Sequence, residues 1–277
     1  MRVAATVREM RDLRRAMAGD VGFVPTMGYL HEGHLSLVRA ARDQNEHVVA
    51  SIFVNPTQFG PNEDFARYPR DTERDLSLLR GERVDAVFMP PVEEIYPEGA
   101  STFVEVDGLT DVLEGAHRPG HFRGVTTVVA KLFAIVQPTR AYFGQKDAQQ
   151  LLVVRRMARD LRLDVEVVGL PIVREPDGLA MSSRNAYLSP AEREAALGLS
   201  RALRRAGELF GAGERDAERL RQAMRSLIGE EPLAQVDYVS VADGETLREL
   251  ERIGRPALAS LAVRIGATRL IDNVTLE

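Results

Sequence analysis

The feature that most constrains the fold is the alternation of apolar, strand-like runs with helical patterns over the first two thirds of the chain. Residues 21–25, 48–54 and 84–89 read as short buried strands, and residues 34–44 and 71–79 between them carry apolar residues at helical spacing. This βαβαβ succession predicts a doubly wound parallel sheet with helices on both faces. We therefore expect a Rossmann-like α/β fold, in which ligands bind beyond the carboxyl ends of the strands.

The pattern of predicted elements differs in the last third of the chain. Before it, we expect two further helices, at residues 125–136 and 148–160, and two further strands, at residues 141–143 and 165–173. Residues 175–178 then read as a turn, and Ser189, followed by proline, is typical of a helix N-cap. Beyond it we expect two helices and three strands, at residues 190–210, 215–228, 235–241, 257–264 and 268–275. The chain is thus predicted to hold a larger domain at 1–175 and a smaller α+β domain at 176–277, joined by a hinge near 174–188.

Composition excludes several classes of protein. The formal charge of -5 and the pI near 5.7 argue against a general nucleic-acid binder, so any polyanion site must be a local concentration of positive charge. Cysteine is absent, which excludes disulfides, thiolate metal sites and thioester intermediates. The chain has no apolar run near the roughly 20 residues of a membrane helix and no secretory signal at its N-terminus. We expect a soluble, cytoplasmic protein without membrane or nucleic-acid partners.

The strongest functional signal is the stretch 27–34, between the first strand and its helix. His31 and His34 flank Gly33, where the backbone can approach a ligand closely. The helix start beyond them is a natural phosphate site, and its dipole favours a neutral His34 that acts as an N–H donor. A capped helix with solvent-facing histidines is the plainer alternative. The His-x-Gly-His pattern resembles the signature of the nucleotidyl-transferring α/β superfamily, which includes class I aminoacyl-tRNA synthetases and cytidylyltransferases.

Two further stretches carry groups suited to phosphate. Residues 181–184 read Met-Ser-Ser-Arg, which either closes over a triphosphate or is an ordinary serine-rich linker. The stretch resembles the second superfamily signature, with Arg184 in place of a lysine. At residues 143–150, Lys146 is one of only two lysines among 36 basic residues, and its compact, mobile charge suits a phosphate that changes geometry. The other, Lys131, is expected to reach solvent from its helix, and Gln149 is interpreted as helix surface.

Two loops suggest contacts with a small acid. The Gln58 amide can both donate and accept, which suits a hydroxyl-bearing acid, although the preceding Asn-Pro is an ordinary turn pattern. His117 and His121 have the spacing of a zinc pair, but the Pro-Gly between them breaks the helix that would align them, so a zinc site is rejected. We expect instead that Arg118 and Arg123 lie near a bound anion, with a purely structural loop as the alternative.

Taken together and in order, these stretches resemble the pantothenate synthetase, or pantoate–β-alanine ligase, family. The resemblance is dense from residue 21 to about 189 and looser through 236–240 and 268–273. It implies an ATP-dependent ligase of coenzyme A precursor biosynthesis that makes a pantoyl adenylate from pantoate, releases pyrophosphate, and passes the acyl group to β-alanine with release of AMP. It also implies Mg²⁺, a homodimer, and a C-terminal domain that acts as a lid.

The same resemblance assigns roles residue by residue. It implies catalytic roles for His34, as general acid, and for His31, Lys146, Ser182, Ser183 and Arg184. It places ATP against Met27, Gly28, Tyr29, Leu30, His31, Glu32, Gly33, His34, Gly144, Gln145, Lys146, Asp147, Val173, Met181, Ser182, Ser183 and Arg184. Pantoate would be held by Gln58 and Gln150, and β-alanine would also meet Gln58. Metal ligands and the base that deprotonates the amine stay unassigned.

The expected chemistry needs these residue types. Attack of a carboxylate on the α-phosphorus of ATP makes an acyl adenylate whose AMP can leave, and this step depends on alignment and charge neutralisation more than on a covalent nucleophile. The sequence lacks the P-loop, the dinucleotide-binding glycine pattern and the zincin motif, which argues against those classes of enzyme. Another nucleotidyltransferase of the same superfamily is the main alternative, and a non-catalytic nucleotide sensor is a second.

Overall fold

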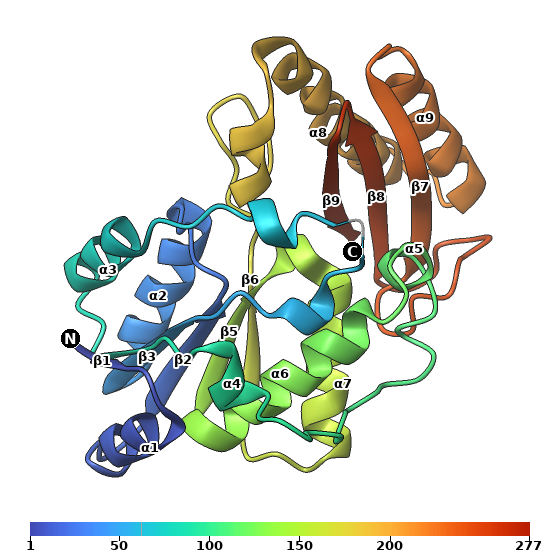
Figure 1. Ribbon diagram of the computed structural model, residues 1–277. Coiled ribbons are helices and arrows are strands. Elements are labelled where there is room, and N and C mark those ends of the chain that lie inside the picture. The colour runs from blue at the N-terminus through green and yellow to red at the C-terminus, as the bar shows by residue number, and fades with distance from the viewer. Residues whose placement is uncertain (62) are drawn as a thin grey trace. The chain divides into compact units, whose positions relative to one another are not determined.

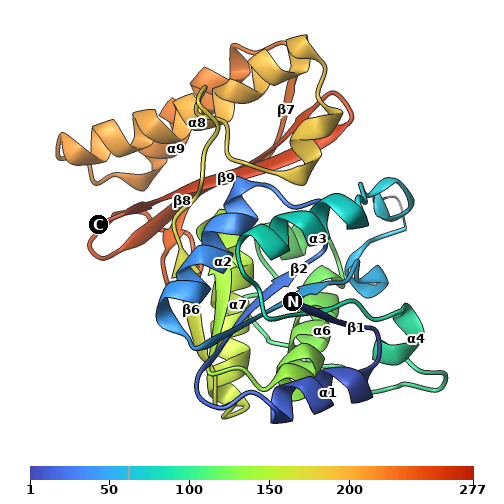
Figure 2. The same ribbon diagram turned by 90° about the vertical axis from the view of Figure 1, so that its left-hand side faces the viewer.

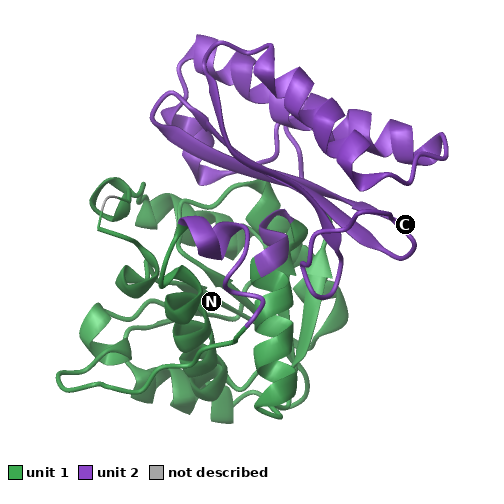
Figure 3. Ribbon diagram, turned by 90° about the vertical axis from the view of Figure 1, so that its right-hand side faces the viewer, with its two compact units in different colours: residues 1–107, 118–145, 150–171 green, residues 108–117, 146–149, 172–277 purple. Residues whose placement is uncertain are grey.

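The computed structural model describes residues 1–61 and 63–277, and these fall into two compact units. Figure 3 colours them separately. Unit 1 comprises Met1–Asp107, Arg118–Gln145 and Gln150–Pro171. Unit 2 comprises Gly108–His117, Lys146–Gln149 and Ile172–Glu277, so the chain enters it three times. No helix in the described part of the chain is both long and apolar enough to cross a membrane.

Unit 1 is built on a six-stranded sheet in which every pair of neighbours is parallel. Its strands, in the order β1-β4-β3-β2-β5-β6, are β1 (Arg2–Ala4), β4 (Ala86–Phe88), β3 (His47–Ile52), β2 (Val21–Thr26), β5 (Arg140–Gly144) and β6 (Glu166–Leu170). The chain builds outward from β2 in one direction through β3 and β4, and then in the other through β5 and β6 (Figure 1). Strand β2 is thus the switch point, where doubly wound sheets bind ligands. The predicted doubly wound parallel sheet is confirmed.

Helices flank this sheet on both faces (Figure 2). They are α1 (Val7–Arg15), α2 (Glu32–Gln44), α3 (Thr72–Gly81), α4 (Val92–Ile95), α6 (His121–Val136) and α7 (Ala148–Asp160), with short 3₁₀ turns η1 (Pro56–Gln58), η2 (Phe65–Arg67) and η3 (Gln145–Asp147). On one face, α2 packs Leu37 and Val38 against Val24, Val48 and other strand residues in a continuous apolar core. The predicted helices are confirmed, although α2 begins two residues earlier than expected and α6 begins four residues earlier.

The sequence analysis missed the first two elements. Strand β1 lies at the edge of the sheet beside β4, and α1 follows it. Helix α1 starts with a reciprocal cap: Thr6 Oγ1 accepts from the Glu9 amide at 3.1 Å, and the Glu9 carboxylate accepts from the Thr6 amide at 3.1 Å. Only Met10 of this arginine-rich helix is buried, so the apolar periodicity that reveals a helix is weak there.

Unit 2 contains an antiparallel sheet with two helices packed on it. Its strands are β7 (Ala234–Asp243), β8 (Ala257–Ile265) and β9 (Thr268–Leu276), in that order, and its helices are α8 (Pro190–Gly211) and α9 (Ala217–Gly229), with the short α5 (Glu114–His117) and η4 (Ser183–Tyr187). All five long elements match the predicted ones to within two residues at each end. Ser189 caps α8 as expected, in a reciprocal box with Glu192. Alternate residues of the three strands join both helices in one apolar core.

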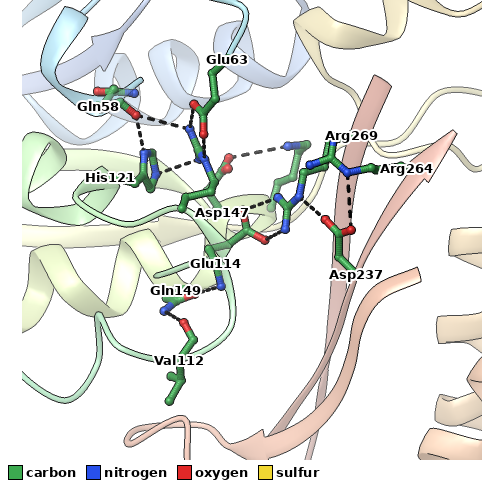
Figure 4. A network of polar contacts seen from close by, with 12 residues as sticks. Gln58, Glu63, Val112, Glu114, His121, Asp147, Gln149, Asp237, Arg264 and Arg269 are labelled. Carbon is green, nitrogen blue, oxygen red and sulfur yellow. Dashed lines mark hydrogen bonds and ion pairs between the residues drawn. The ribbon is translucent and has the colours of Figure 1, made fainter. Parts of the chain in front are cut away.

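The segment 108–117 is held to β7 and β9 by buried polar contacts (Figure 4). Arg269 donates to both oxygens of Glu114 at 2.6 and 2.8 Å and, through Nε, to Asp237 at 2.6 Å. Tyr238 also bonds Glu114, and burial together with this carboxylate raises the pKa of Tyr238 well above its ordinary value. Charge-assisted bonds of this kind are short and strong, so they fix the segment on the sheet.

Gln149 belongs to the same arrangement, which corrects its interpretation as helix surface. Its side chain is buried, Nε2 donates to the carbonyls of Leu109 and Val112 at 2.8 Å each, and Oε1 accepts from the Glu114 amide at 3.0 Å. The amide thus satisfies three backbone groups of the 108–117 segment, which explains why a polar side chain is buried there.

Candidate active site

The turn between β2 and α2 carries both predicted histidines. His31 is the N-cap of α2, and its Nδ1 accepts from the Gly33 amide at 3.2 Å. The Nδ1 of His34 accepts in turn from the His31 amide at 3.3 Å, and the two ring centroids are 4.1 Å apart. Because each Nδ1 accepts an N–H, the neutral rings carry their protons on Nε2. The expected position of both histidines at a helix start is confirmed, and their partners fix which nitrogen can donate to a ligand.

A buried carboxylate shapes the same turn. Asp75 of α3 accepts from the amides of Tyr29 and Leu30, at 2.7 Å each. Gly28 and Tyr29 both have positive φ, 82° and 50°, and a Cβ on Gly28 would lie 3.0 Å from the Asp75 carboxylate and from Ile52. Burial raises the pKa of Asp75, against the lowering effect of the two amides. Sequence reasoning missed this residue, although a carboxylate four positions before the buried Leu79 of an amphipathic helix is a readable signal.

Asn55 organises the Gln58 loop, which corrects its interpretation as an ordinary turn residue. It is 1% exposed, and its Nδ2 donates to Gln58 Oε1 and to the Gly124 carbonyl, at 3.1 Å each. Its Oδ1 accepts from the amide and hydroxyl of Thr57, at 3.3 and 2.9 Å, and from the Tyr96 hydroxyl at 2.9 Å. The loop is therefore preorganised around one side-chain amide. Gln58 Nε2 faces Met27 Sδ at 3.3 Å, so two predicted ligand contacts meet here.

The loop before α6 is tied to carboxylates and backbone groups. Arg118 pairs with Glu63 through two nitrogens, at 2.7 Å each. Burial alone would raise the pKa of Glu63, but this pairing holds the pKa below its usual value. Arg123 lies 3.2 Å from Glu105 and stacks 3.8 Å from the ring of Phe103. Since both guanidinium groups pair with carboxylates, these contacts do not support the anion loop that the sequence suggested.

The two histidines with zinc-like spacing lie on different helices. His117 ends α5, His121 begins α6, and Gly120 between them has φ 81°, so the two rings do not share a helix face. Over residues 1–61 and 63–277, no cluster of three or more histidine or carboxylate side chains is arranged to hold a metal ion.

Unit 2 carries the remaining predicted phosphate contacts. Lys146 lies in η3, directly after β5, which ends at Gly144. The Lys146 ammonium is 3.8 Å from the Asp147 carboxylate, and the Lys146 carbonyl accepts a hydrogen bond from Asn273 Nδ2 at 2.9 Å. The stretch 181–184 follows a tight turn, in which the Gly178 amide donates to the Glu175 carbonyl at 2.8 Å, as predicted.

This stretch is ordered by its own backbone bonds. The Met181 amide donates to the Val173 carbonyl at 3.0 Å, and Ser182 Oγ caps η4 by accepting from the Arg184 amide at 3.2 Å. Two pairs of predicted ATP contacts are thus in direct contact: Met181 with Val173, and Arg184 with Ser182. Gln150 begins the unit 1 part of α7 and is partly exposed.

Lys131 differs from expectation. Its ammonium donates to the Ile95 carbonyl at 2.6 Å and lies 4.4 Å from the centroid of the Tyr96 ring, and burial lowers its pKa. Lys131 is thus partly exposed but has two partners that the prediction did not include. Lys131 supports the tyrosine whose hydroxyl binds Asn55.

A doubly wound parallel sheet with paired imidazoles at the helix after its switch-point strand defines a nucleotide-binding α/β enzyme. Comparison with known proteins narrows this class. A family profile described as pantoate-beta-alanine ligase matches residues 2–275. The chain is 66% identical over 277 residues to a pantothenate synthetase from Roseiflexus sp. (strain RS-1), with 100% of each chain covered.

Two solved structures agree with this. A pantothenate synthetase from Thermus thermophilus is 55% identical, with a TM-score of 0.95 and 99% of each chain covered. A pantoate-beta-alanine ligase from Francisella tularensis, complexed with beta-gamma ATP and beta-alanine, is 34% identical, with a TM-score of 0.81 over 99% of this chain and 97% of that one. The chain belongs to the pantoate–β-alanine ligase family. The predicted family, the enzyme class and the joining of pantoate to β-alanine are confirmed.

Proposed function

We propose that the ligation proceeds in two steps, with ATP as co-substrate and a pantoyl adenylate as the intermediate. The pantoate carboxylate attacks the α-phosphorus of ATP and releases pyrophosphate, and the β-alanine amine then displaces AMP from the acyl carbon. The complex of the Francisella relative supports ATP and β-alanine as ligands. The observation that carries the proposal is the pair of histidines at the start of α2, whose Nδ1 atoms are both bonded to backbone amides.

His31 and His34 are proposed to stabilise the triphosphate. With Nδ1 occupied, each neutral ring presents an Nε2–H donor, and the amides at the start of the 13-residue α2 add a positive potential. Preorganised donors of this kind stabilise charge as it develops on the departing pyrophosphate. His34 is the general acid of this proposal. The turn 27–33, shaped by Asp75, is assigned to the rest of the nucleotide contact in unit 1.

Gln58 is proposed to hold pantoate, together with Gln150, and also to meet β-alanine. Its Oε1 is fixed by Asn55, whereas its Nε2 faces the sulfur of Met27 at 3.3 Å. A thioether is a weak acceptor, so a substrate oxygen can take this N–H at little cost. The amide is thus oriented before the substrate arrives, which lowers the entropy lost on binding.

In unit 2, Lys146, Ser182, Ser183 and Arg184 are assigned to the phosphates, and unit 2 is proposed to act as the lid. The Ser182 cap fixes the backbone of η4 at Arg184. Mg²⁺ is proposed on the phosphates, where it would lower their negative charge; such ions usually take one or two carboxylates and several oxygens of the substrate. Glu32 is hydrogen-bonded to Arg39, whereas the ammonium of Lys146 is 3.8 Å from Asp147, so Asp147 is the less tightly paired carboxylate among the assigned ATP contacts and would suit this role. A homodimer and a cytoplasmic location are proposed on the family resemblance.

Pantoate-dependent exchange between ATP and pyrophosphate tests the first step. We expect exchange that requires pantoate and does not require β-alanine, followed by AMP release when β-alanine is added. Exchange with pantoate absent and another acceptor present would favour a different nucleotidyltransferase, and binding of ATP without exchange would favour a sensor. Gln58→Ala is expected to slow both steps; if only the KM for ATP changes, the placement of Gln58 is wrong.

A further inference from the structure

We propose that His121 is a positioning residue, whose neutral imidazole, protonated on Nδ1, holds the backbone of Gln58 and thereby aims the Gln58 amide at the substrates. The inference rests on the role proposed above for Gln58. Figure 4 shows His121 beside Gln58, with one ring nitrogen toward it; the other nitrogen lies by Arg118, which Glu63 binds. His121 itself is buried, with 8% of its surface exposed.

The partners of His121 admit one arrangement of its protons. Nδ1 lies 2.9 Å from the carbonyl oxygen of Gln58, and Nε2 lies 3.0 Å from Nη1 of Arg118. A carbonyl oxygen can only accept, so Nδ1 carries a proton. A guanidinium can only donate, so Nε2 presents its lone pair. The ring is therefore the neutral Nδ1–H form, opposite to the form that His31 and His34 adopt.

Arg118 is itself immobilised, so it acts as a fixed reference for the ring. Its Nε and Nη2 donate to the two oxygens of Glu63 at 2.7 Å each, and the two side chains are only 16% and 25% exposed. Nη2 also approaches the Gln58 carbonyl at 3.4 Å. Two parallel charge-assisted bonds define the plane of the guanidinium, and that plane sets the position of its third nitrogen against His121.

The Gln58 carbonyl needs such a partner because of where it lies. Gln58 is the last residue of η1, and the final carbonyls of a helical turn have no partner within the turn. Asn55 fixes the side-chain end of Gln58 at 3.1 Å, and His121 fixes the main-chain end at 2.9 Å. Between these two anchors the residue has little freedom to rotate, so the direction of its amide hydrogens is set.

Substitutions at His121 separate its two contacts. An asparagine can place a donor near the Nδ1 position, whereas a glutamine reaches toward the Nε2 position. We expect His121→Ala to raise the KM for pantoate and for β-alanine about tenfold, the loss of roughly one hydrogen bond, with little change in the KM for ATP. His121→Asn is expected to recover most of this loss and His121→Gln less. His47, an imidazole at the start of β3, is the matched control, and His47→Asn should leave all three KM values unchanged.

Nitrogen NMR of the histidine side chains reads the proton arrangement without substrates. The His121 signal in the wild-type spectrum is assigned as the one that disappears in His121→Gln. At neutral pH that signal should show a protonated Nδ1 and an unprotonated Nε2. The opposite form, or equal effects of the asparagine and glutamine variants, overturns the proposal, as does a rise in the KM for ATP alone. If His121→Ala does not fold, the comparison of the other two variants decides. A wild-type protein without pantoate-dependent exchange would instead overturn the proposed function, whatever the NMR shows.

Discussion

Gly124 leaves no room for a side chain beside Thr57: a Cβ at this position would lie 2.4 Å from the Thr57 carbonyl oxygen. The first turn of α6 therefore rests directly on the backbone of η1. Since Asn55 also binds the Gly124 carbonyl, the helix and the Gln58 loop are positioned as one piece.

Gly124→Ala is expected to push η1 away from α6, because neither backbone can yield as a flexible side chain can. We expect a loss of roughly 1–3 kcal/mol in the free energy of unfolding and a higher KM for pantoate. Gly207→Ala is the matched control, since Gly207 lies inside α8 with nothing within 4 Å of its added Cβ, and it should stabilise the protein by about 0.5–1 kcal/mol. Thermal unfolding and steady-state kinetics check both, and an unchanged KM in Gly124→Ala would contradict the coupling.

His34→Ala is expected to lower pantoate-dependent exchange by about 10²–10³, because one preorganised donor to developing charge is lost. The same change removes the acceptor of the His31 amide, which costs about 0.5–2 kcal/mol of stability. His34→Asn separates the two effects, since its oxygen can still accept from that amide while the distant Nε2–H is gone. We expect normal stability and low exchange from it. Recovery of exchange in this variant would mean that His34 serves only as a cap.

Lys146→Arg is expected to bind ATP within a modest factor and yet to lose most of its exchange activity. A planar guanidinium cannot follow a phosphate from ground state to transition state as a rotating ammonium can. Lys146→Ala sets the floor for comparison. Lys131 does not serve as a neutral control, because its ammonium supports Tyr96 and so bears on Asn55. Near wild-type exchange in Lys146→Arg would show that positive charge alone suffices.

Asp75 is expected to make the free energy of unfolding depend on pH. Its pKa is raised in the folded protein by burial, so the native state binds a proton more readily than the unfolded state does. Its contribution to stability is therefore fully present below the unfolded pKa, near 3.8, and is lost as the pH rises through the folded pKa. Chemical denaturation across this range should show the wild-type protein losing stability relative to Asp75→Asn as the pH rises. Parallel curves for the two proteins would contradict the raised pKa.

Asp75→Asn is also expected to raise the KM for ATP. An amide has one acceptor oxygen, so one of the Tyr29 and Leu30 amides loses its partner and the turn before His31 loosens. Kinetics with ATP varied and pantoate saturating would show this, and an unchanged KM would mean that the turn keeps its shape without the second bond.

Sequence patterns predicted the helices and strands that bury many residues in the two cores, and they missed helix α1, which buries only one residue. Strand β2 and helix α8 were predicted closely because their apolar spacing, and the Ser189 cap of α8, are local signals. Helix α1 has one buried residue, so its periodicity is weak, although its Thr6–Glu9 cap could have been read.

The site divides in the same way. Residues in compact motifs, such as His31 and His34, are visible because their partners are neighbours in sequence. Asp75, Asn55 and His121 depend on partners that are 45, 69 and 63 residues away, respectively, and no local pattern shows which distant amide or carbonyl a side chain will meet. Asp75 alone left a trace, as a charge on an apolar helix face.

The pairing of Glu114 with Arg269 has a consequence for how the protein is made, because the two residues are 155 positions apart. A ribosome adds about 5–20 residues per second, so Glu114 is made roughly 8–30 s before its partner exists. During that interval the Glu114 carboxylate, which is buried in the folded protein, has no guanidinium partner; once β8 has been made, its edge stays open until β9 follows. Loss of β9 alone, a strand of 9 residues, would make the absence of this partner permanent and would leave the Glu114 carboxylate, in the middle of the chain, without its guanidinium. A nascent chain halted before β9 therefore presents an unpaired β8 edge, the kind of edge at which chains aggregate.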